Sequence, residues 1–263
     1  MSLVSLADVN PNAVEQYGGK ATTLARLIQE GYTVPDGIAV EAQFSHNGHL
    51  HRIGDRVEEW ARSRGSTPVI VRSSANIEDG AANSFAGLFE SFIVPPDDVL
   101  DAVERCYSFI DSTRVTTYSQ TFGIDPETIR LGVIVQEVVD ADACGVCFTT
   151  HPVRDDDTVV IEAAAGIGYS EQDDVTPDRF VVSQDGELVT KDVSVQQYTT
   201  ALTEDGLIDR ESAIERQVVT DSTVVRIAEQ CLGIEKALSY QADIEWAVRD
   251  GTVFILQARP ITT

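Results

Sequence analysis

The polypeptide alternates between two kinds of hydrophobic pattern. In one, apolar residues recur every three or four positions, which predicts amphipathic helices. In the other, apolar residues are continuous or alternate with polar ones, which predicts strands. Helices are expected from residue 18 to a stop at Gly31, over 52–64, from Pro96 to 110, and over 221–232 with a stop at Gly233. Strands are expected ending at residue 40 and over 68–72, 89–94, 132–139, 144–149, 158–163, 242–248 and 252–259.

The order of these elements favours an α+β fold. Strands and helices interleave without a regular strand–helix repeat, and short turns join neighbouring strands. That arrangement favours largely antiparallel sheets over a doubly wound parallel sheet. With 263 residues the chain is long enough for one large domain or for two lobes around a shared cleft.

Charge changes what the protein is expected to bind. The chain has 43 acidic and 19 basic residues, a formal net charge of −24. Such a field repels nucleic acid and anionic membranes, so neither is expected as a partner. Among the basic residues only Lys20, Lys191 and Lys236 are lysines. Abundant carboxylates with arginine in place of lysine are typical of halophilic proteins, and an ordinary acidic cytosolic protein is the alternative.

Signals for membranes, metals and redox chemistry are weak. No charged-then-apolar leader opens the sequence and no apolar run approaches the ~20 residues that span a bilayer, so we expect a soluble, cytoplasmic protein. Cys144 and Cys147 have the spacing of a redox or zinc motif, but they lie in a strand-like run with no second pair, so packing is expected. His46, His49 and His51 cluster without an evident fourth ligand, and no metal is expected there.

The first candidate site is Gly18-Gly19-Lys20, at the start of the first helix. Exposed glycine amides and the helix dipole suit an anion, and lysine adds a point charge for phosphate. The tripeptide is not a Walker loop, so it is a weak signal alone. The scarcity of lysine in the chain strengthens it, because lysine is evidently not kept for surface solubility.

The second candidate is Arg72, which leaves a buried strand and is followed by Ser73 and Ser74. A small-residue segment over 83–91 comes next along the chain. Guanidinium binds phosphate oxygens in bidentate fashion, and backbone amides near glycine can approach a polyphosphate closely. The alternative is a salt-bridged arginine at a strand end beside a routine turn.

The third candidate is the C-terminal pair of strands. Asp243 and Glu245 share one face of the first strand, while Gln257 and Arg259 share one face of the second. Carboxylates, an amide oxygen and a guanidinium on one surface would make a Mg²⁺–phosphate site, since magnesium prefers oxygen ligands. The alternative is a solvated polar face. The opposite face is expected to be filled by Ile244, Trp246, Phe254, Leu256 and Ala258.

Whether the four polar groups meet depends on the turn between the strands. A two-residue loop at 250–251 would pair Glu245 with Leu256 and leave Gln257 on the other face. A three-residue loop at 249–251, with its glycine left-handed in a G1 bulge, pairs Asp243 with Gln257 and brings the groups together. The same loop pairs Gln241 with Arg259.

Taken together and in order, these segments resemble a known family. They are Gly18 to Ala21, Val34 to Val40, Val71 to Ala75, Ser84 to Gly87, Val135-Gln136, Gly145 to Thr149, Val175 to Asp178, Asp243 to Trp246 and Leu256 to Thr262. The sequence is similar to the N-terminal nucleotide-binding domain of phosphoenolpyruvate synthase, pyruvate phosphate dikinase and rifampicin phosphotransferase, which has an ATP-grasp fold. The resemblance implies two lobes around a nucleotide cleft, over residues 1–130 and 131–263.

The resemblance also implies a role for each site residue. Lys20 and Arg72 would hold ATP phosphates, and Arg259 would steady the phosphates undergoing transfer, so these three form the catalytic set. Mg²⁺ would be bound by Glu245 and Gln257, with Asp243 nearby. The remaining ATP contacts would be Gln136 at the adenine hinge and Gly87, Leu88 and Ser91 in the loop that closes over the phosphates.

The expected function follows from this resemblance. The sequence lacks the family's phosphohistidine domain and its pyruvate-binding barrel, so we expect an ATP- and Mg²⁺-binding phosphotransferase module, incomplete as a single chain. It would donate a phosphoryl or pyrophosphoryl group to a histidine on a separate protein that carries the acceptor domain. One alternative is a non-catalytic ATP sensor or regulator, and another is a substrate-binding or interaction protein.

Overall fold

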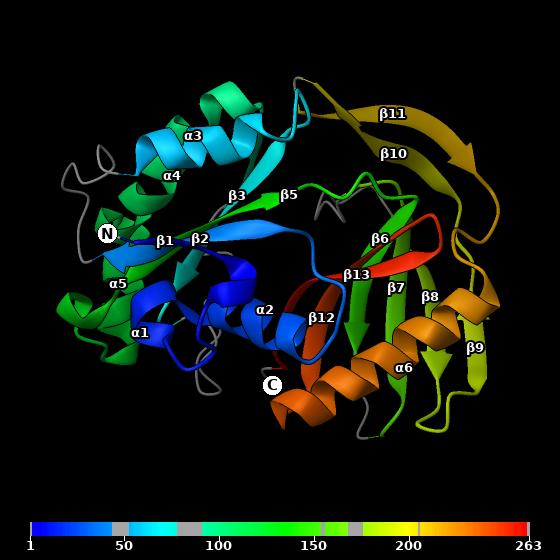
Figure 1. Ribbon diagram of the computed structural model, residues 1–263. Helices are drawn as coiled ribbons and strands as arrows, with labels where there is room; N and C mark the ends of the chain where they lie inside the picture. The colour runs from blue at the N-terminus through cyan, green and yellow to red at the C-terminus, as the bar shows by residue number, and fades with distance from the viewer. Residues whose placement is uncertain are drawn as a thin grey trace.

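The computed structural model describes residues 2–43, 53–77, 91–153, 156–167, 176–204 and 206–261. Two sheets with antiparallel strands lie side by side, and helices pack against them (Figure 1). The predicted α+β class with largely antiparallel sheets is confirmed. The predictions for the histidine cluster, and for Gly87 and Leu88, lie outside the described residues.

The first sheet has five strands in the order β1-β2-β5-β3-β4. They are β1 (Leu3–Ser5), β2 (Gly37–Gln43), β3 (Val69–Ala75), β4 (Ser91–Val94) and β5 (Leu131–Glu137). Apolar side chains of one face pack against α3 (Gly54–Arg62) and α4 (Val99–Ser108), and those of the other face pack in part against α2 (Gly19–Gln29). The strand β5 follows the expected lobe boundary at residue 130 but pairs with β2 and β3, so the chain leaves this sheet after Glu137.

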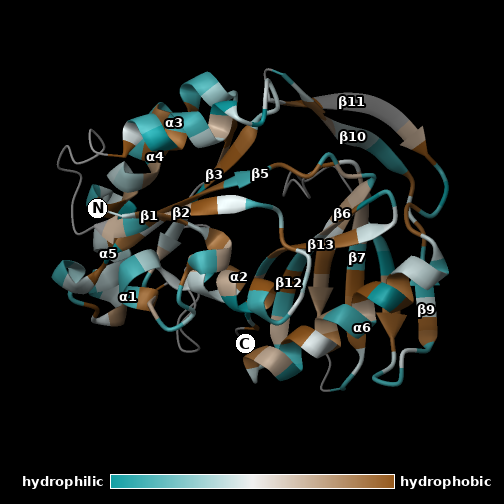
Figure 2. Ribbon diagram, in the orientation of Figure 1, coloured by the Kyte–Doolittle hydropathy of each residue, from teal (hydrophilic) through white to brown (hydrophobic). Residues whose placement is uncertain are grey.

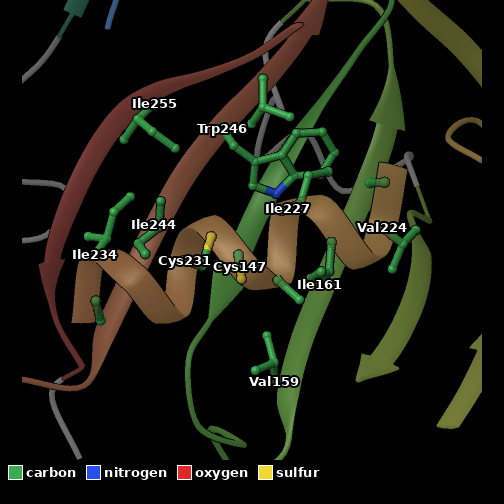
Figure 3. Packing of buried hydrophobic residues seen from close by; sticks show 14 of the residues in the cluster. Cys147, Val159, Ile161, Val224, Ile227, Cys231, Ile234, Ile244, Trp246 and Ile255 are labelled. Atoms are coloured by element: carbon green, nitrogen blue, oxygen red, sulfur yellow. The ribbon is translucent and has the colours of Figure 1, made fainter. Parts of the chain in front are cut away.

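The second sheet has six strands in the order β13-β12-β6-β7-β8-β9. They are β6 (Ala143–Phe148), β7 (Val159–Ala165), β8 (Asp178–Val182), β9 (Leu188–Asp192), β12 (Ala242–Arg249) and β13 (Thr252–Pro260). One face packs against the long helix α6 (Asp221–Leu238), with Trp246, Ile161 and Ile227 fully buried between them (Figure 3). Brown segments run along β6 and β7 in Figure 2, as expected for strands buried in a core. The face away from α6 is left for the cleft.

The helix α6 is longer than the sequence predicts. It was expected to stop at Gly233, but it continues to Leu238 and ends at Ser239, whose φ of 64° is left-handed. A glycine inside a helix costs about 1 kcal/mol relative to alanine. Burying Ile234 and Leu238 beyond it contributes about 1.5–3 kcal/mol each, so packing outweighs the local stop signal.

Several elements carry too little hydrophobic pattern to be predicted. They are α1 (Val14–Tyr17), α5 (Thr113–Phe122), β1, β8, β9 and the two-stranded ribbon β10 (Gln196–Thr203) and β11 (Gly206–Ile214). The helix α5 is rich in threonine and starts at Ser112, whose hydroxyl accepts a hydrogen bond from the amide of Val115. The ribbon arches from the second sheet toward the first (Figure 1). Within the described residues, no helix is long and apolar enough to cross a membrane.

The packing of α6 makes a first prediction. Replacing Ile234, which is fully buried, by alanine should lower the free energy of unfolding by about 2–5 kcal/mol. The matched control is Glu229→Ala on the exposed side of the same helix, which should change it by no more than about 0.5 kcal/mol. Chemical denaturation of both variants measures the difference, and equal losses would contradict the packing described here.

Candidate functional site

A cleft of about 400 Å³ lies between the two sheets. The first sheet contributes Ile70 and Arg72 from β3, Ile93 from β4 and Gln136 from β5. The second sheet contributes its face opposite α6, which bears Val146, Phe148, Glu162, Asp243 and Glu245. Charged groups gather where β3 meets the β12–β13 hairpin, while Val139, Ala141 and Cys144 make the cleft apolar where the chain passes from β5 to β6.

The β12–β13 hairpin has the two-residue loop, one of the two turns that the sequence left open. Arg249 pairs with Thr252, so the loop has two residues, and both Asp250 (φ 50°) and Gly251 (φ 73°) are left-handed. Such a pair is typical of a type I′ turn, the tight connection that matches the twist of the strands. The alternative, a three-residue loop with a G1 bulge at the glycine, is therefore excluded.

The polar groups nevertheless meet, because a bulge lies further along the hairpin. Glu245 pairs with Gln257 while the next residue, Trp246, pairs with Ile255, which leaves Leu256 as the extra residue. The shift also pairs Asp243 with Arg259 instead of with Gln257. All four polar side chains now share the cleft face. The bulge corrects the predicted core as well, since Ile255 packs with Trp246 while Phe254 and Leu256 lie in a separate cluster.

Arg72 joins the two sheets across the cleft. Its Nη1 donates a hydrogen bond to the carbonyl oxygen of Leu256 at 2.6 Å. Its Nη2 donates to Glu245 Oε2 at 3.1 Å and to Gln257 Oε1 at 2.6 Å. The residue is only 6% exposed, and its Nε has no hydrogen-bond partner within the described part of the chain. The predicted arginine is thus a salt-bridged residue whose Nε–H has no partner among the described residues.

Asp243 and Arg259 form the second charged contact. Arg259 donates from Nε and Nη2 to Asp243 Oδ2 at 2.9 Å and 2.8 Å. The other oxygen, Oδ1, is buried and has no hydrogen-bond partner among the described residues. Burial raises the pKa of the Asp243 carboxyl, although Arg259 opposes the shift, and nearby Glu245 adds to it. The site therefore holds a carboxylate that its protein partner compensates incompletely.

Lys20, at the start of α2, contacts the C-terminal part of β3 and is not among the residues that line the cleft described above. Its Nζ donates a hydrogen bond to the carbonyl oxygen of Ser73 at 2.9 Å, and the residue is 6% exposed. Gly18 and Gly19 are buried rather than exposed as expected. Gly18 has a φ of 82°, and a Cβ there would lie 1.9 Å from the carbonyl oxygen of Ser74, so the glycine is needed for close approach. The amide of Ala21 donates to Ser74 Oγ, so this helix start is capped by the protein itself.

The remaining predicted residues lie in different parts of the structure. Gln136 lines the cleft, is 1% exposed, and donates from Nε2 to the carbonyl oxygen of Pro35 at 2.9 Å. Ser91 pairs with Arg72 in the β3–β4 ladder and is exposed. Cys144 and Cys147 lie on opposite faces of β6, as their odd separation predicts, with Cys147 in the α6 core.

Glu162 is a cleft residue that the sequence analysis missed. It lies on β7, between buried apolar neighbours, and pairs with Val146 of β6, which pairs in turn with Glu245 of β12. Its side chain lines the cleft. The available signal was a single acidic residue in an otherwise apolar strand. Charged side chains are rarely buried without a partner or a ligand, so one in a buried strand indicates a candidate site.

Residues 47–263 match the family described as "Pyruvate phosphate dikinase, AMP/ATP-binding domain". The chain belongs to this family. The family resemblance found in the sequence is thereby confirmed.

Similar proteins agree with the family assignment. The chain is 33% identical to a probable phosphoenolpyruvate synthase of Methanothermobacter thermautotrophicus, over 88% of this chain and 33% of the relative. It is 33% identical to a rifampicin phosphotransferase of Streptomyces sviceus, over 99% and 29%, and 30% identical to a phosphoenolpyruvate synthase of Pyrococcus furiosus, over 100% and 33%. The chain therefore spans about a third of the length of these curated relatives. A solved L-amino acid ligase from Bacillus licheniformis overlaps it loosely, with a TM-score of 0.47 and 12% identity over 95% of this chain and 43% of the other.

A divalent cation fits the side chains that meet where Arg72 contacts the β12–β13 hairpin. Arg72 Nη2 lies between oxygens of Glu245 and Gln257, so these two side chains already bind a positive charge. Asp243 Oδ1 beside them is buried and lacks a partner within the described ranges. Two carboxylates and an amide oxygen are ligands that Mg²⁺ accepts. The part of the chain that the structure describes has no group of three or more His, Cys, Asp or Glu side chains placed to hold a metal ion.

The incomplete compensation of Asp243 makes a second prediction. Because burial disfavours its charged form, Asp243→Asn should raise the midpoint of thermal unfolding by about 2 °C in the absence of ligand. Removing the other half of the pair should have the opposite sign, since Arg259→Gln leaves the carboxylate without its cation. That loss should be about 1–2 kcal/mol, below the value for a fully buried pair because the Arg259 side chain is 34% exposed. Calorimetry of both variants tests the signs, and a lower midpoint for Asp243→Asn would contradict this description.

Proposed function

We propose that the chain is the ATP- and Mg²⁺-binding module of a phosphoenolpyruvate synthase-like phosphotransferase. The observation that carries the proposal is the contact of Arg72 with Glu245, Gln257 and the Leu256 carbonyl, because it brings the predicted phosphate-binding and metal-binding groups to one point. The two sheets with their helices would be the two lobes that hold the nucleotide between them.

Three cations are available for the polyphosphate. Lys20, Arg72 and Arg259 each bind an oxygen of the protein in the absence of ligand. Phosphate oxygens would replace some of these acceptors, and the unpartnered Nε of Arg72 supplies a donor without any exchange. These groups would neutralise the charge that develops during transfer, so the protein acts by positioning and electrostatics rather than by forming a covalent bond itself.

Glu245 and Gln257 would hold Mg²⁺, with Asp243 beside them, and the ion would supply charge neutralisation on the polyphosphate when bound. This exchange frees Arg72 from its carboxylate, since Glu245 would turn to the metal as Arg72 turns to phosphate. Metal and nucleotide would therefore bind together more readily than either binds alone. Metal binding to Glu245 would free Arg72 for phosphate, and phosphate binding to Arg72 would free Glu245 for the metal.

The apolar region of the cleft would take the adenine. Gln136 lies at the end of β5, where the chain passes to the second sheet, and Val139 and Cys144 supply apolar contacts nearby. Flat apolar walls with a few polar groups at the edge are typical of a base-binding pocket. Ser91, the first residue of β4, would be a further contact to ATP.

The acceptor would be a histidine on a separate polypeptide. Its ring nitrogen would attack either the γ-phosphorus, releasing ADP, or the β-phosphorus, releasing AMP after pyrophosphoryl transfer. The final acceptor would be pyruvate, by similarity to the relatives described as phosphoenolpyruvate synthases. A non-catalytic ATP sensor shares the binding site but not this step, so transfer distinguishes the two functions.

Binding provides the third prediction. ATP with Mg²⁺ should raise the thermal midpoint of the wild type, and Lys20→Ala and Arg72→Ala should each weaken ATP affinity by about tenfold or more, the value of one charge-assisted contact. The matched control is Lys191→Ala, whose amine pairs with Asp221 on the surface away from the cleft. Measurements belong in both dilute and molar KCl, because the acidic composition favours a halophilic protein. An absence of any shift at millimolar ATP in both salts would refute nucleotide binding.

Transfer provides the fourth prediction. ATP labelled in the γ- or the β-phosphate, incubated with the protein and with purified histidine-domain proteins, should give an acid-labile label on the acceptor. Label from the γ-position alone indicates phosphoryl transfer, and label from both positions indicates pyrophosphoryl transfer. Arg259→Gln should abolish labelling while leaving most ATP binding intact. Binding without labelling of any acceptor would favour the sensor.

A further inference from the structure

Two cysteines meet in the core between α6 and the second sheet. Cys147 lies on β6 and Cys231 on α6, and both are fully buried free thiols (Figure 3). The two thiols are hydrogen-bonded to each other. Neither side chain lines the cleft, because both belong to the core on the α6 side of the sheet. The proposed ATP site therefore leaves this pair without a role.

The contact between the two sulfur atoms depends on tertiary packing, since the cysteines lie far apart in the sequence. Cys147 has a fixed place in the sheet, where it pairs with Ile244 of β12 on one side and Ile161 of β7 on the other. A disulfide needs an S–S distance of about 2.05 Å and Cβ atoms about 3.5–4.5 Å apart. Thiols that already share a hydrogen bond need only a small rotation of the side chains and a slight approach of α6 to meet these values.

Burial keeps the pair reduced while α6 stays packed. It raises the pKa of the Cys147 thiol well above its usual value, and the hydrogen bond with Cys231 and the nearby Asp243 carboxylate add to the shift. Because the thiolate is the form that attacks an oxidant, the packed pair reacts slowly. Gly233 follows Cys231 closely within α6, and a glycine weakens the helix at that point. Local opening of this end of the helix would admit water and a small oxidant.

We propose that Cys147 and Cys231 are a redox-sensitive pair, which hydrogen peroxide converts into a disulfide between β6 and α6. One thiolate attacks a peroxide oxygen, giving a sulfenic acid and a hydroxide, which takes up the first thiol's proton and becomes water. The sulfur of the other cysteine then attacks the sulfenic sulfur, and the hydroxyl leaves with the second thiol's proton as another water. Two thiols thus lose two electrons, and one peroxide is reduced to two waters. The inference is independent of the proposed ATP-binding function.

The disulfide would form directly behind the cleft. Val146 and Phe148 flank Cys147 on β6 and line the cleft, and Ile244 beside it separates Asp243 from Glu245 on β12. A cross-link that closes a long loop stabilises a protein mainly by restricting its unfolded chain. Oxidation would therefore hold α6 on the sheet that carries the proposed metal-binding side chains.

The fifth prediction concerns the folded wild type after reduction, removal of the reductant and treatment with hydrogen peroxide. Alkylation under denaturing conditions and peptide mapping should find Cys147 joined to Cys231 in most molecules, with the loss of two hydrogen atoms. The protein should still run as a single chain on a non-reducing denaturing gel. Its thermal midpoint should rise by about 5–10 °C, and a thiol reductant should reverse the rise.

The matched control is Cys106→Ala, because Cys106 is equally buried but lies on α4 in the core of the first sheet. This variant should keep the cross-link and the rise in midpoint, whereas Cys231→Ala should lose both. If Cys231→Ala fails to fold, peptide mapping of the wild type decides alone. Folded wild type that keeps both thiols, that carries sulfinic or sulfonic acid on separate cysteines, or that joins a different pair would overturn the inference.

Discussion

The buried guanidinium of Arg72 is the interaction on which the rest of the cleft depends. It leaves the first sheet on β3 and finds its acceptors on β12 and β13 of the second, so the relative position of the sheets is tied to its hydrogen bonds. A charge on a residue that is only 6% exposed would cost about 3–5 kcal/mol if its partner were removed. The acceptors are therefore needed for stability in the ligand-free protein, and two of them, the oxygens of Glu245 and Gln257, are those that would hold a metal.

That contact requires the bulge at Leu256. Without the extra residue, the two-residue turn would direct Gln257 toward α6 and place its amide in an apolar core. With it, Gln257 stands opposite Glu245, and the Leu256 carbonyl becomes an acceptor for Arg72. The bulge thus converts an ordinary hairpin into one whose backbone and side chains converge on one cation. It also sends Ile255 inward to Trp246, so the core and the site are adjusted by the same residue.

The sequence predicted what local patterns determine and missed what distant contacts determine. Asp243, Glu245, Gln257 and Arg259 were predicted as a set because they share a polar face on an otherwise apolar hairpin. Arg72 was a separate candidate, which only the family resemblance joined to them. The means by which they meet was not predicted, since a bulge has no local signal when the turn before it is a good type I′ turn. The same limit explains Gly233 inside α6, because the buried side chains beyond it decide where the helix ends. Glu162 was overlooked since its significance depends on a row across three strands, which the linear sequence does not display.

The strong negative charge of the chain repels anions at long range, whereas the cationic side chains at the cleft act on them at contact. With a net charge of −24, the distant field opposes the approach of a polyphosphate. Surface carboxylates are screened by salt, and at 1 M the screening length falls to about 3 Å. Lys20 and Arg72 are only 6% exposed, so their attraction acts over contacts that salt screens much less. Added salt therefore weakens the repulsion by surface carboxylates more than the attraction by the buried cations. The net affinity of the proposed site for an anion should rise as salt is added. The repulsion of nucleic acid expected from the composition and the attraction of phosphate proposed for the cleft are compatible, because one acts at long range and the other at contact.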